Sequence, residues 1–421
     1  MSGSRRRPRR TAAAAGLLLS CVLATASCAS ANTGSAASGQ PDAPADSSSG
    51  PAAVQGSAGS SSGSADGSGT GSTGAGTTSA AASTANLTPM QLAGQRVIYS
   101  FSGTTIPSSL LTLIRDGEAA GVIFFGDNIT SVSQLAGLSK QLVEAQQASP
   151  VHLPLLLMTD QEGGQVRRIP DGQPTDSERT IGESSDPSQQ AAQAGSGAAQ
   201  TLTDAGLNVN LAPVLDVYAV PGNFDDQFGR SYSSDPNVVS AAGSSFITAQ
   251  QKGGVAATAK HFPGLGTAST SEDTDNEPVT LTEPLSQLRA VDELPYKAAI
   301  ASGVDLVMLS WAVYPALDAN HPAGMSSTIV QQELRDRLGY TGVTITDALE
   351  AKALENYGGY SERAVDAASA GMDLLLCSGG SVSEGQDATD GLEAALQGGQ
   401  LTTSSFDAAV ARIDALRQKL S

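Results

Sequence analysis

The chain has few of the residues that build redox or metal centres. It contains three cysteines, three histidines and one tryptophan among 421 residues, and it has neither a CxxC nor an HExxH motif. Cys377 is the only cysteine outside the N-terminal region, so the folded part cannot form an intramolecular disulfide and must depend on its core. We expect no metal and no organic cofactor. Because Cys377 follows three leucines, we expect a buried strand residue there rather than a nucleophile.

Basic residues are scarce, and five of them lie within the first ten positions. Lysine and arginine total 23 against 42 acidic residues, which gives a formal charge of −19. Without the five arginines of residues 5–10, 18 basic residues remain and the formal charge becomes −24. This excess of negative charge argues against nucleic acids and anionic lipids as ligands of the domain surface.

The N-terminus has the pattern of a secretory signal peptide over residues 1–28. The apolar stretch of residues 12–26 follows the arginine cluster and is too short to span a bilayer. Cys28 resembles the lipidated cysteine of a bacterial lipoprotein, although Thr25 stands where an aliphatic residue is usual, and Cys21 fits that rule better but leaves a short apolar region. We expect an extracytoplasmic lipoprotein whose only membrane contact is this anchor, with ordinary cleavage and release as the alternative.

Residues 29–86 consist almost entirely of Ser, Gly, Ala, Thr, Pro and Asp, and Val54 is the only aliphatic residue larger than alanine. Such a segment cannot bury enough apolar surface to fold. As a flexible coil it would reach roughly 40 to 45 Å. We predict a disordered linker that holds a domain of residues 87–421 away from a membrane, although a secreted protein could carry the same tail.

Short apolar runs that end in polar residues recur along residues 87–421. Val255–Gly266 reads VAATAKHFPGLG, in which an alanine-rich run delivers Lys260 and His261 and is then broken by proline and glycine. Polar groups at the C-terminal ends of parallel strands form the active site of a βα barrel. In chain order, the eight runs are RVIYSF, GVIFFG, LPLLLMTD, NVNLAPVLDV, VAATAKHF, DLVMLSWAV, GVTITDAL and MDLLLCSG.

Segments with helical spacing separate these runs, and the alternation predicts an α/β fold, a (β/α)8 TIM barrel in a single domain. Asp186 before Pro187 and Asp235 before Pro236 are typical N-cap and first-turn pairs of helices. We expect residues 381–421 to form a loop and two helices, with no second αβα domain.

Five segments resemble family 3 glycoside hydrolases, and the greatest similarity is to the single-domain bacterial β-N-acetylglucosaminidases of NagZ type. They occur in the family's order and spacing: DQEGGQVRR (160–168), GRSYSSDP (229–236), KHFPGLG (260–266), ELPYKAAI (293–300) and TGVTITDAL (341–349). The resemblance implies a monomeric retaining exo-β-N-acetylhexosaminidase that removes terminal GlcNAc from peptidoglycan-derived or related glycans. The alternatives are a β-glucosidase-like hydrolase of the same family and a catalytically silent carbohydrate-binding lipoprotein.

Glycoside hydrolysis needs one carboxylate at the anomeric carbon and one acid that protonates the leaving oxygen. The resemblance implies that Asp347 is the nucleophile, and the alternative is an aspartate that caps a helix beginning at Ala348. It further implies that five residues bind the sugar hydroxyls: Asp160, Arg168, Arg230, Lys260 and His261. The alternative for Arg230 is a surface salt bridge. Glu162 and Asp216 fit structural roles that hold the basic groups in place.

The chain departs from the family pattern at three places. Gln165 replaces an arginine of the family's GRVxR, and Trp311 stands where many relatives have histidine, either as a sugar-stacking platform or as a packed barrel residue. The loop after Gly266 lacks the family's acid/base histidine. By position we predict Asp273 as the catalytic acid; its rivals are Glu272, Asp275 and Glu277, and the alternative is a mobile acidic loop without a catalytic role.

Overall fold

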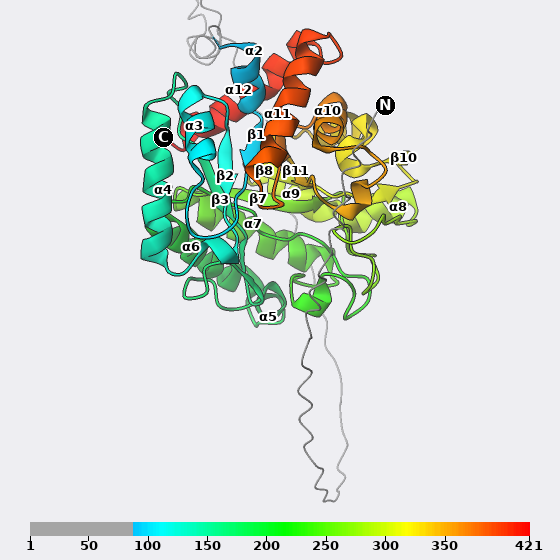
Figure 1. Cartoon of the computed structure of the whole chain (residues 1–421). Helices are drawn as coiled ribbons and strands as arrows, with labels where there is room; N and C mark the ends of the chain where they lie inside the picture. The colour runs from blue at the N-terminus through cyan, green and yellow to red at the C-terminus, as the bar shows by residue number, and fades with distance from the viewer. Residues whose placement is uncertain (1–86) are drawn as a thin grey trace, which may run out of the picture. The chain divides into compact units, whose positions relative to one another are not determined.

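The computed structural model describes residues 87–421, and in this part eight parallel strands close into a barrel (Figure 1). The order around the barrel is β1-β12-β11-β8-β7-β6-β3-β2. These strands are β1 Val97–Tyr99, β2 Gly121–Ile123, β3 Leu156–Thr159, β6 Val209–Asn210, β7 Ala256–Phe262, β8 Leu306–Leu309, β11 Val343–Ala348 and β12 Leu374–Leu376. Each lies within one of the eight apolar runs, so the predicted (β/α)8 barrel is confirmed. The signal-peptide and linker predictions, with Cys21 and Cys28, fall outside the described residues.

The strands are apolar on both faces because one face fills the barrel and the other meets the helices. Side chains alternate along a strand, so β3 places Leu156 and Met158 in the inner cluster and Leu157 in the outer one. The run around β6 forms the shortest barrel strand. Pro213 interrupts it, because proline has no amide hydrogen to donate to a neighbouring strand. Cys377 is fully buried, as predicted, but it follows β12 and is not part of the strand.

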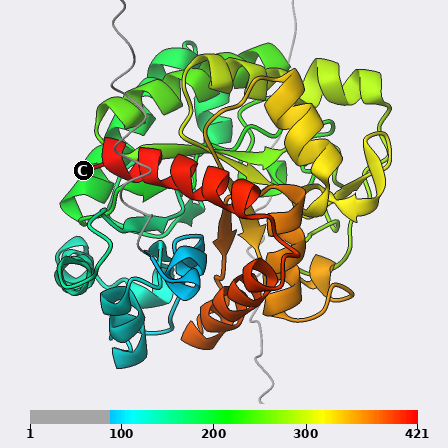
Figure 2. The ribbon, with the colours of Figure 1, turned by 90° about the horizontal axis from the view of Figure 1, so that it is seen from above.

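Helices surround the barrel and close one of its ends. They are α2 Pro89–Gly94, α3 Ser108–Asp116, α4 Val132–Gln147, α5 Glu178–Gly182, α6 Pro187–Asp204, α7 Pro236–Lys252, α8 Leu285–Gln287, α9 Leu294–Ala301, α10 Tyr360–Ala370, α11 Val382–Gln397 and α12 Thr403–Lys419. Figure 2 shows α12, in red, lying across the barrel. Its Ile413 and Leu416 pack into the inner apolar cluster, which leaves the opposite end, at the C-terminal ends of the strands, for a binding site.

The predicted helix starts and the two C-terminal helices are confirmed. The carboxylate of Asp186 accepts a hydrogen bond from Gln189 N at 3.0 Å, and that of Asp235 accepts one from Asn237 N at 2.9 Å. These caps satisfy amide groups that have no partner within α6 and α7. The segment STIVQQELRDRLG (327–339), which has helical spacing, contains a π-helix at Thr328–Arg337. No helix of the described residues combines the length and apolar character needed to cross a membrane.

We predict that residues 87–421 fold without residues 29–86. Every strand of the barrel lies within residues 87–421, and the preceding segment has almost no large apolar side chain to contribute to a core. Thermal unfolding of the mature chain and of residues 87–421 should therefore give one shared cooperative transition. Loss of that transition in the shorter chain would place the domain boundary upstream of residue 87.

Candidate active site

A cavity of about 380 Å³ lies at the C-terminal ends of the barrel strands. Its floor consists of apolar side chains of the barrel interior: Ile123, Leu211, Met308 and Leu376. All seven predicted site residues line the same cavity: Asp160, Arg168, Arg230, Lys260, His261, Asp273 and Asp347. The structure therefore brings together side chains that are up to 187 positions apart in the sequence.

Lys260 and Arg230 are held by buried carboxylates on one side of the cavity. Lys260 Nζ lies 2.8 Å from Asp160 Oδ1 and 2.7 Å from Glu162 Oε1. Arg230 makes a bidentate contact with Glu162 at 2.9 and 3.0 Å, and a third bond of 2.9 Å with Asp225 Oδ1. Burial alone would raise the pKa of Glu162, but the charges of Arg230 and Lys260 outweigh it and lower that pKa to about 2. Arg230 is thus part of a buried ion network and not a surface salt bridge.

A short hairpin absent from the predictions positions Glu162 and Arg168. It pairs β4 (Gln161–Gly163) with β5 (Val166–Arg167), and Gln165 lies exposed in its turn, away from the cavity. Arg168 Nε lies 3.8 Å from Asp160 Oδ2. Arg168 Nε is buried and has no hydrogen-bond partner among the described residues. A ligand hydroxyl could accept that N–H, which fits the predicted role of Arg168 in sugar binding.

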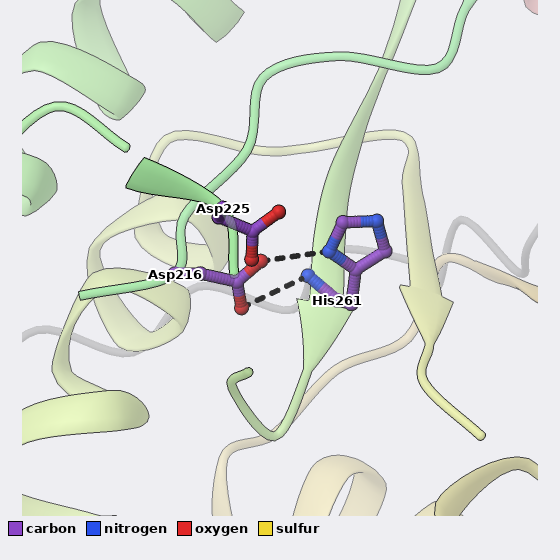
Figure 3. Close-up of side chains that lie close together, drawn as sticks. All are labelled: Asp216, Asp225 and His261. Carbon is purple, nitrogen blue, oxygen red and sulfur yellow. Dashed lines mark hydrogen bonds and ion pairs between the residues drawn. The ribbon is translucent and has the colours of Figure 1, made fainter. Parts of the chain in front are cut away.

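His261 is held in one orientation by Asp216. Its Nδ1 lies 2.7 Å from Asp216 Oδ2 (Figure 3). Asp216 Oδ1 also accepts a 2.7 Å bond from Leu265 N. Burial, reinforced by the charge of Arg230, lowers the pKa of His261 to about 4, so the ring is neutral at pH 7. Because Nδ1–H donates to Asp216, the other nitrogen, Nε2, is an acceptor. The structural roles predicted for Glu162 and Asp216 are confirmed.

Asp216, Asp225 and His261 are the one group of described residues whose ligand atoms could surround a metal ion, all lying within 4.8 Å of one another (Figure 3). Their potential ligand atoms already take part in hydrogen bonds and ion pairs within the protein. Asp216 binds the imidazole, and Arg230 places a fixed positive charge 2.9 Å from Asp225. Burial raises the pKa of Asp216 to about 6 and that of Asp225 to about 7, as expected for neighbouring carboxyl groups that share a proton. This donor set fits a hydrogen-bonded cluster better than a divalent cation.

Asp347 is the penultimate residue of β11 and lines the cavity. Its Oδ1 accepts a 2.8 Å bond from the adjacent amide of Ala348, and the next helical turn, at Lys352–Leu354, has Ala351 as its N-cap. The capping alternative for Asp347 is therefore wrong. Burial raises the pKa of Asp347; the charge of Asp275 adds to the rise, whereas His261 and Lys260 oppose it. Trp311 is buried and donates Nε1–H to Ala348 O at 2.8 Å, so it is a packed barrel residue that supports the backbone beside Asp347.

Two of the four candidate acids, Asp273 and Asp275, line the cavity. Both carboxylate oxygens of Asp273 are used within the turn: Oδ1 accepts from Asp275 N at 2.9 Å and Oδ2 from Asn276 Nδ2 at 2.5 Å. No group among residues 87–421 donates a hydrogen bond to the carboxylate of Asp275. That carboxylate is open to solvent at the cavity mouth, but the protein packed round it removes enough water to raise its pKa. The charges of Asp273 and Glu350 add to the rise.

The acid loop, residues 267–277, is tied to the turn that follows Asp347. Lys352 N donates to Asp275 O at 3.2 Å, and Ala353 N donates to Thr274 O at 3.1 Å. Thr274, which belongs to this loop, is buried. These bonds attach the acid loop to the segment that follows Asp347, and Asp275 and Asp347 line the same cavity. The loop is therefore not an unattached acidic segment.

The sequence analysis missed three other residues of the site. Asp225, which pairs with Arg230 but does not itself line the cavity, has no local signal because its role depends on burial. Glu350 and Ser378 line the cavity, and Ser378 donates from both N and Oγ to the Glu350 carboxylate, at 3.1 and 2.6 Å. Glu350 could have been predicted as a site residue from its position three residues after the predicted nucleophile.

Comparison with known proteins gives a consistent picture. Residues 93–416 match the profile of the Glycosyl hydrolase family 3 N terminal domain. An "Uncharacterized secreted glycosyl hydrolase" of Arthroderma benhamiae is 46% identical over 331 residues, which cover 78% of this chain and 93% of that protein. A β-hexosaminidase of Stenotrophomonas maltophilia is 34% identical over 287 residues, covering 66% of this chain and 82% of the relative. The solved family 3 β-N-acetylglucosaminidase of Paenibacillus sp. FPU-7 has a TM-score of 0.75 at 34% identity; the match covers 79% of this chain but 63% of that protein.

Proposed function

Because the chain belongs to glycosyl hydrolase family 3 and is a glycoside hydrolase, we propose that it is a retaining exo-β-N-acetylhexosaminidase of the NagZ branch. The proposed substrates are peptidoglycan-derived or related glycans that end in GlcNAc. One observation supports this above all: Asp347 and Asp275 face one cavity whose inner wall carries Asp160, Lys260 and His261. The relatives named as β-hexosaminidase and β-N-acetylglucosaminidase favour a GlcNAc substrate over glucose.

In the proposed mechanism, Asp347 attacks the anomeric carbon and forms a covalent glycosyl-enzyme while the leaving oxygen takes a proton from an acid of the loop, Asp275 or Asp273. The resulting carboxylate then removes a proton from water, which attacks the same carbon from the face the leaving group vacated and releases Asp347. Two inversions give net retention. The buried cations and carboxylates of the inner wall orient the sugar hydroxyls, which keeps the anomeric carbon in line with Asp347.

We further propose that the enzyme acts outside the cytoplasm as a lipoprotein anchored at its N-terminus. The signal-like sequence of residues 1–28 supports this location, as does a relative described as secreted. The domain surface itself is acidic and gives an anionic membrane nothing to bind.

We predict that the full chain hydrolyses an aryl β-N-acetylglucosaminide with a kcat/KM at least about tenfold above that for the matching aryl β-glucoside. A favourable contact with the 2-acetamido group in the transition state would account for a difference of this size. Initial rates of phenolate release measure both values. The reverse preference would identify a β-glucosidase-like enzyme, and glycan binding without turnover would identify a silent carbohydrate-binding protein.

A further inference from the structure

Exposed apolar side chains are concentrated beside the mouth of the cavity. Among the described residues, three large hydrophobic side chains are exposed, and two of them, Val220 at 64% and Phe228 at 40%, lie in one loop. We call residues 219–229 the rim loop. It runs directly into Arg230, which lines the cavity, and its Phe224 lines the cavity as well. The third exposed residue, Val143, lies on α4, outside this loop.

The rim loop is held by hydrogen bonds, so the exposure of Phe228 does not come from a lack of attachment. Asn223 Nδ2 donates to Gly266 O at 2.6 Å, and Gly222 N donates to Asp226 Oδ2 at 2.6 Å. The loop ends in a 3₁₀ turn at Asp226–Phe228 that is followed by Gly229 at φ 70°, a left-handed conformation that glycine adopts without strain. A rigid loop that keeps an aromatic ring in water gives up the free energy its burial would provide.

Phe224 and Phe228 form one aromatic surface that leads out of the cavity. Their ring centroids are 6.3 Å apart with an interplanar angle of 84°, which is a favourable edge-to-face arrangement. Phe224 is half-buried at the wall, and Phe228 continues the apolar surface into solvent. An occupant of the cavity that extends past Phe224 therefore meets Phe228 next.

The rim loop also contacts the acid loop. Phe224 N donates to Ala268 O at 3.3 Å, and Gln227 Nε2 donates to Thr270 O at 3.0 Å. The leaving oxygen of a substrate must lie within reach of the catalytic acid on this loop. The group attached to that oxygen therefore emerges between the two loops.

We propose that Phe224, Phe228 and Val220 form a leaving-group platform that binds the second sugar ring of a β-linked disaccharide or longer glycan. The inference rests on the proposed function, since it names the occupant of the leaving-group side of the same site. A pyranose ring has an apolar C–H face, which stacks on an aromatic ring, and a hydroxyl edge, which hydrogen-bonds to carboxylates. The rim loop offers the first surface and the acid loop the second.

Charge favours a neutral second sugar over an anionic one, which narrows the proposed substrates to glycans whose second ring carries no acidic group. Asp273 and Asp275 stand at the cavity mouth, and Glu272 and Glu277 belong to the same loop. The carboxylates of this loop that remain ionised when the catalytic acid is protonated would repel a phosphate headgroup or an acidic peptide that approached the platform. They do not oppose a neutral sugar, whose hydroxyls can donate hydrogen bonds to them.

The test compares substrates that share the first sugar and differ in the leaving group. In the full chain, Phe228→Ala should lower kcat/KM for the β-1,4-linked GlcNAc disaccharide about 3- to 10-fold, as expected for loss of one stacking contact. For methyl β-N-acetylglucosaminide, whose leaving group cannot reach Phe228, the value should stay within about twofold of wild type. Val220→Ser and Val143→Ser form a matched pair: the first should weaken disaccharide turnover selectively and the second should change neither substrate.

A binding measurement separates this inference from the proposed function. In an Asp347→Ala background, calorimetry should show tighter binding of the disaccharide than of GlcNAc, and Phe228→Ala should remove most of that advantage. Equal affinities for the two sugars, or equal losses on both substrates with Phe228→Ala, would overturn the platform. Failure of wild type to cleave either glycoside, with the disaccharide advantage intact, would overturn the proposed catalysis and leave the platform standing.

Discussion

Replacement of Asp347 by alanine in the full chain is expected to lower kcat for an aryl β-N-acetylglucosaminide by at least about 10⁴-fold. The reason is that this carboxylate is the only bond-forming group of the proposed first step, and loss of a nucleophile is among the largest single effects in enzymes. The melting temperature should change little. Asp347 accepts one hydrogen bond, from its own neighbour Ala348, and burial already disfavours its charge. Initial rates and a thermal melt measure the two effects.

Asp336→Ala is a matched control, since Asp336 is an exposed aspartate on the π-helical segment, outside the cavity. It should retain wild-type activity. The covalent intermediate gives an independent readout: a slow fluorinated substrate should add the mass of one sugar to the peptide that contains Asp347. Retention of the anomeric configuration in early NMR spectra should accompany it. A product of inverted configuration would contradict the double displacement, which requires the two carboxyl groups to lie about 5 to 5.5 Å apart.

The sequence predicted the barrel well because each strand is short, apolar and bounded by turn residues. Parallel strands buried on both faces give near-continuous apolar runs, and β3 and β12 are examples. It predicted the strand-end site residues for the same reason, since the first polar residue after a strand lies at the rim of the barrel. The apolar runs placed Lys260 and Asp347 near strand ends, whereas their roles as sugar-binding residue and nucleophile were implied by the resemblance to family 3.

The rest of the site depends on contacts that one-dimensional spacing does not encode. The β4–β5 hairpin brings Glu162 beneath Lys260 and Arg230, although its residues contain no alternating strand pattern. The difference between Asp273 and Asp275 depends on which of them closes a turn with its own side chain. Position along the loop favoured Asp273 as the catalytic acid. In the structure, the carboxylate of Asp273 accepts two hydrogen bonds within the turn, whereas that of Asp275 accepts none from the described residues.

The second large effect concerns the catalytic acid, for which contact geometry favours Asp275 and the family spacing favours Asp273. Asp275→Ala should lower kcat/KM about 10²- to 10⁴-fold on an aryl glycoside with a poor leaving group, the range expected for general acid catalysis. On a dinitrophenyl glycoside, which departs without a proton, formation of the glycosyl-enzyme should be far less affected. Added azide should restore turnover and give a β-glycosyl azide. Asp273→Ala should weaken the turn and reduce rates on both substrates by a similar, smaller factor.

The pH dependence gives this assignment a second, independent readout. Burial raises the pKa of Asp347, and partial loss of water together with the charges of Asp273 and Glu350 raises the pKa of Asp275. The reaction needs Asp347 ionised and Asp275 protonated. Activity should therefore fall as pH decreases through the pKa of Asp347, and fall again as pH rises through the pKa of the acid. Asp275→Ala should remove the alkaline limb and keep the acidic one. If Asp273→Ala instead removes the alkaline limb and shows azide rescue, the acid is Asp273, and the free carboxylate of Asp275 then acts through its charge on Asp347.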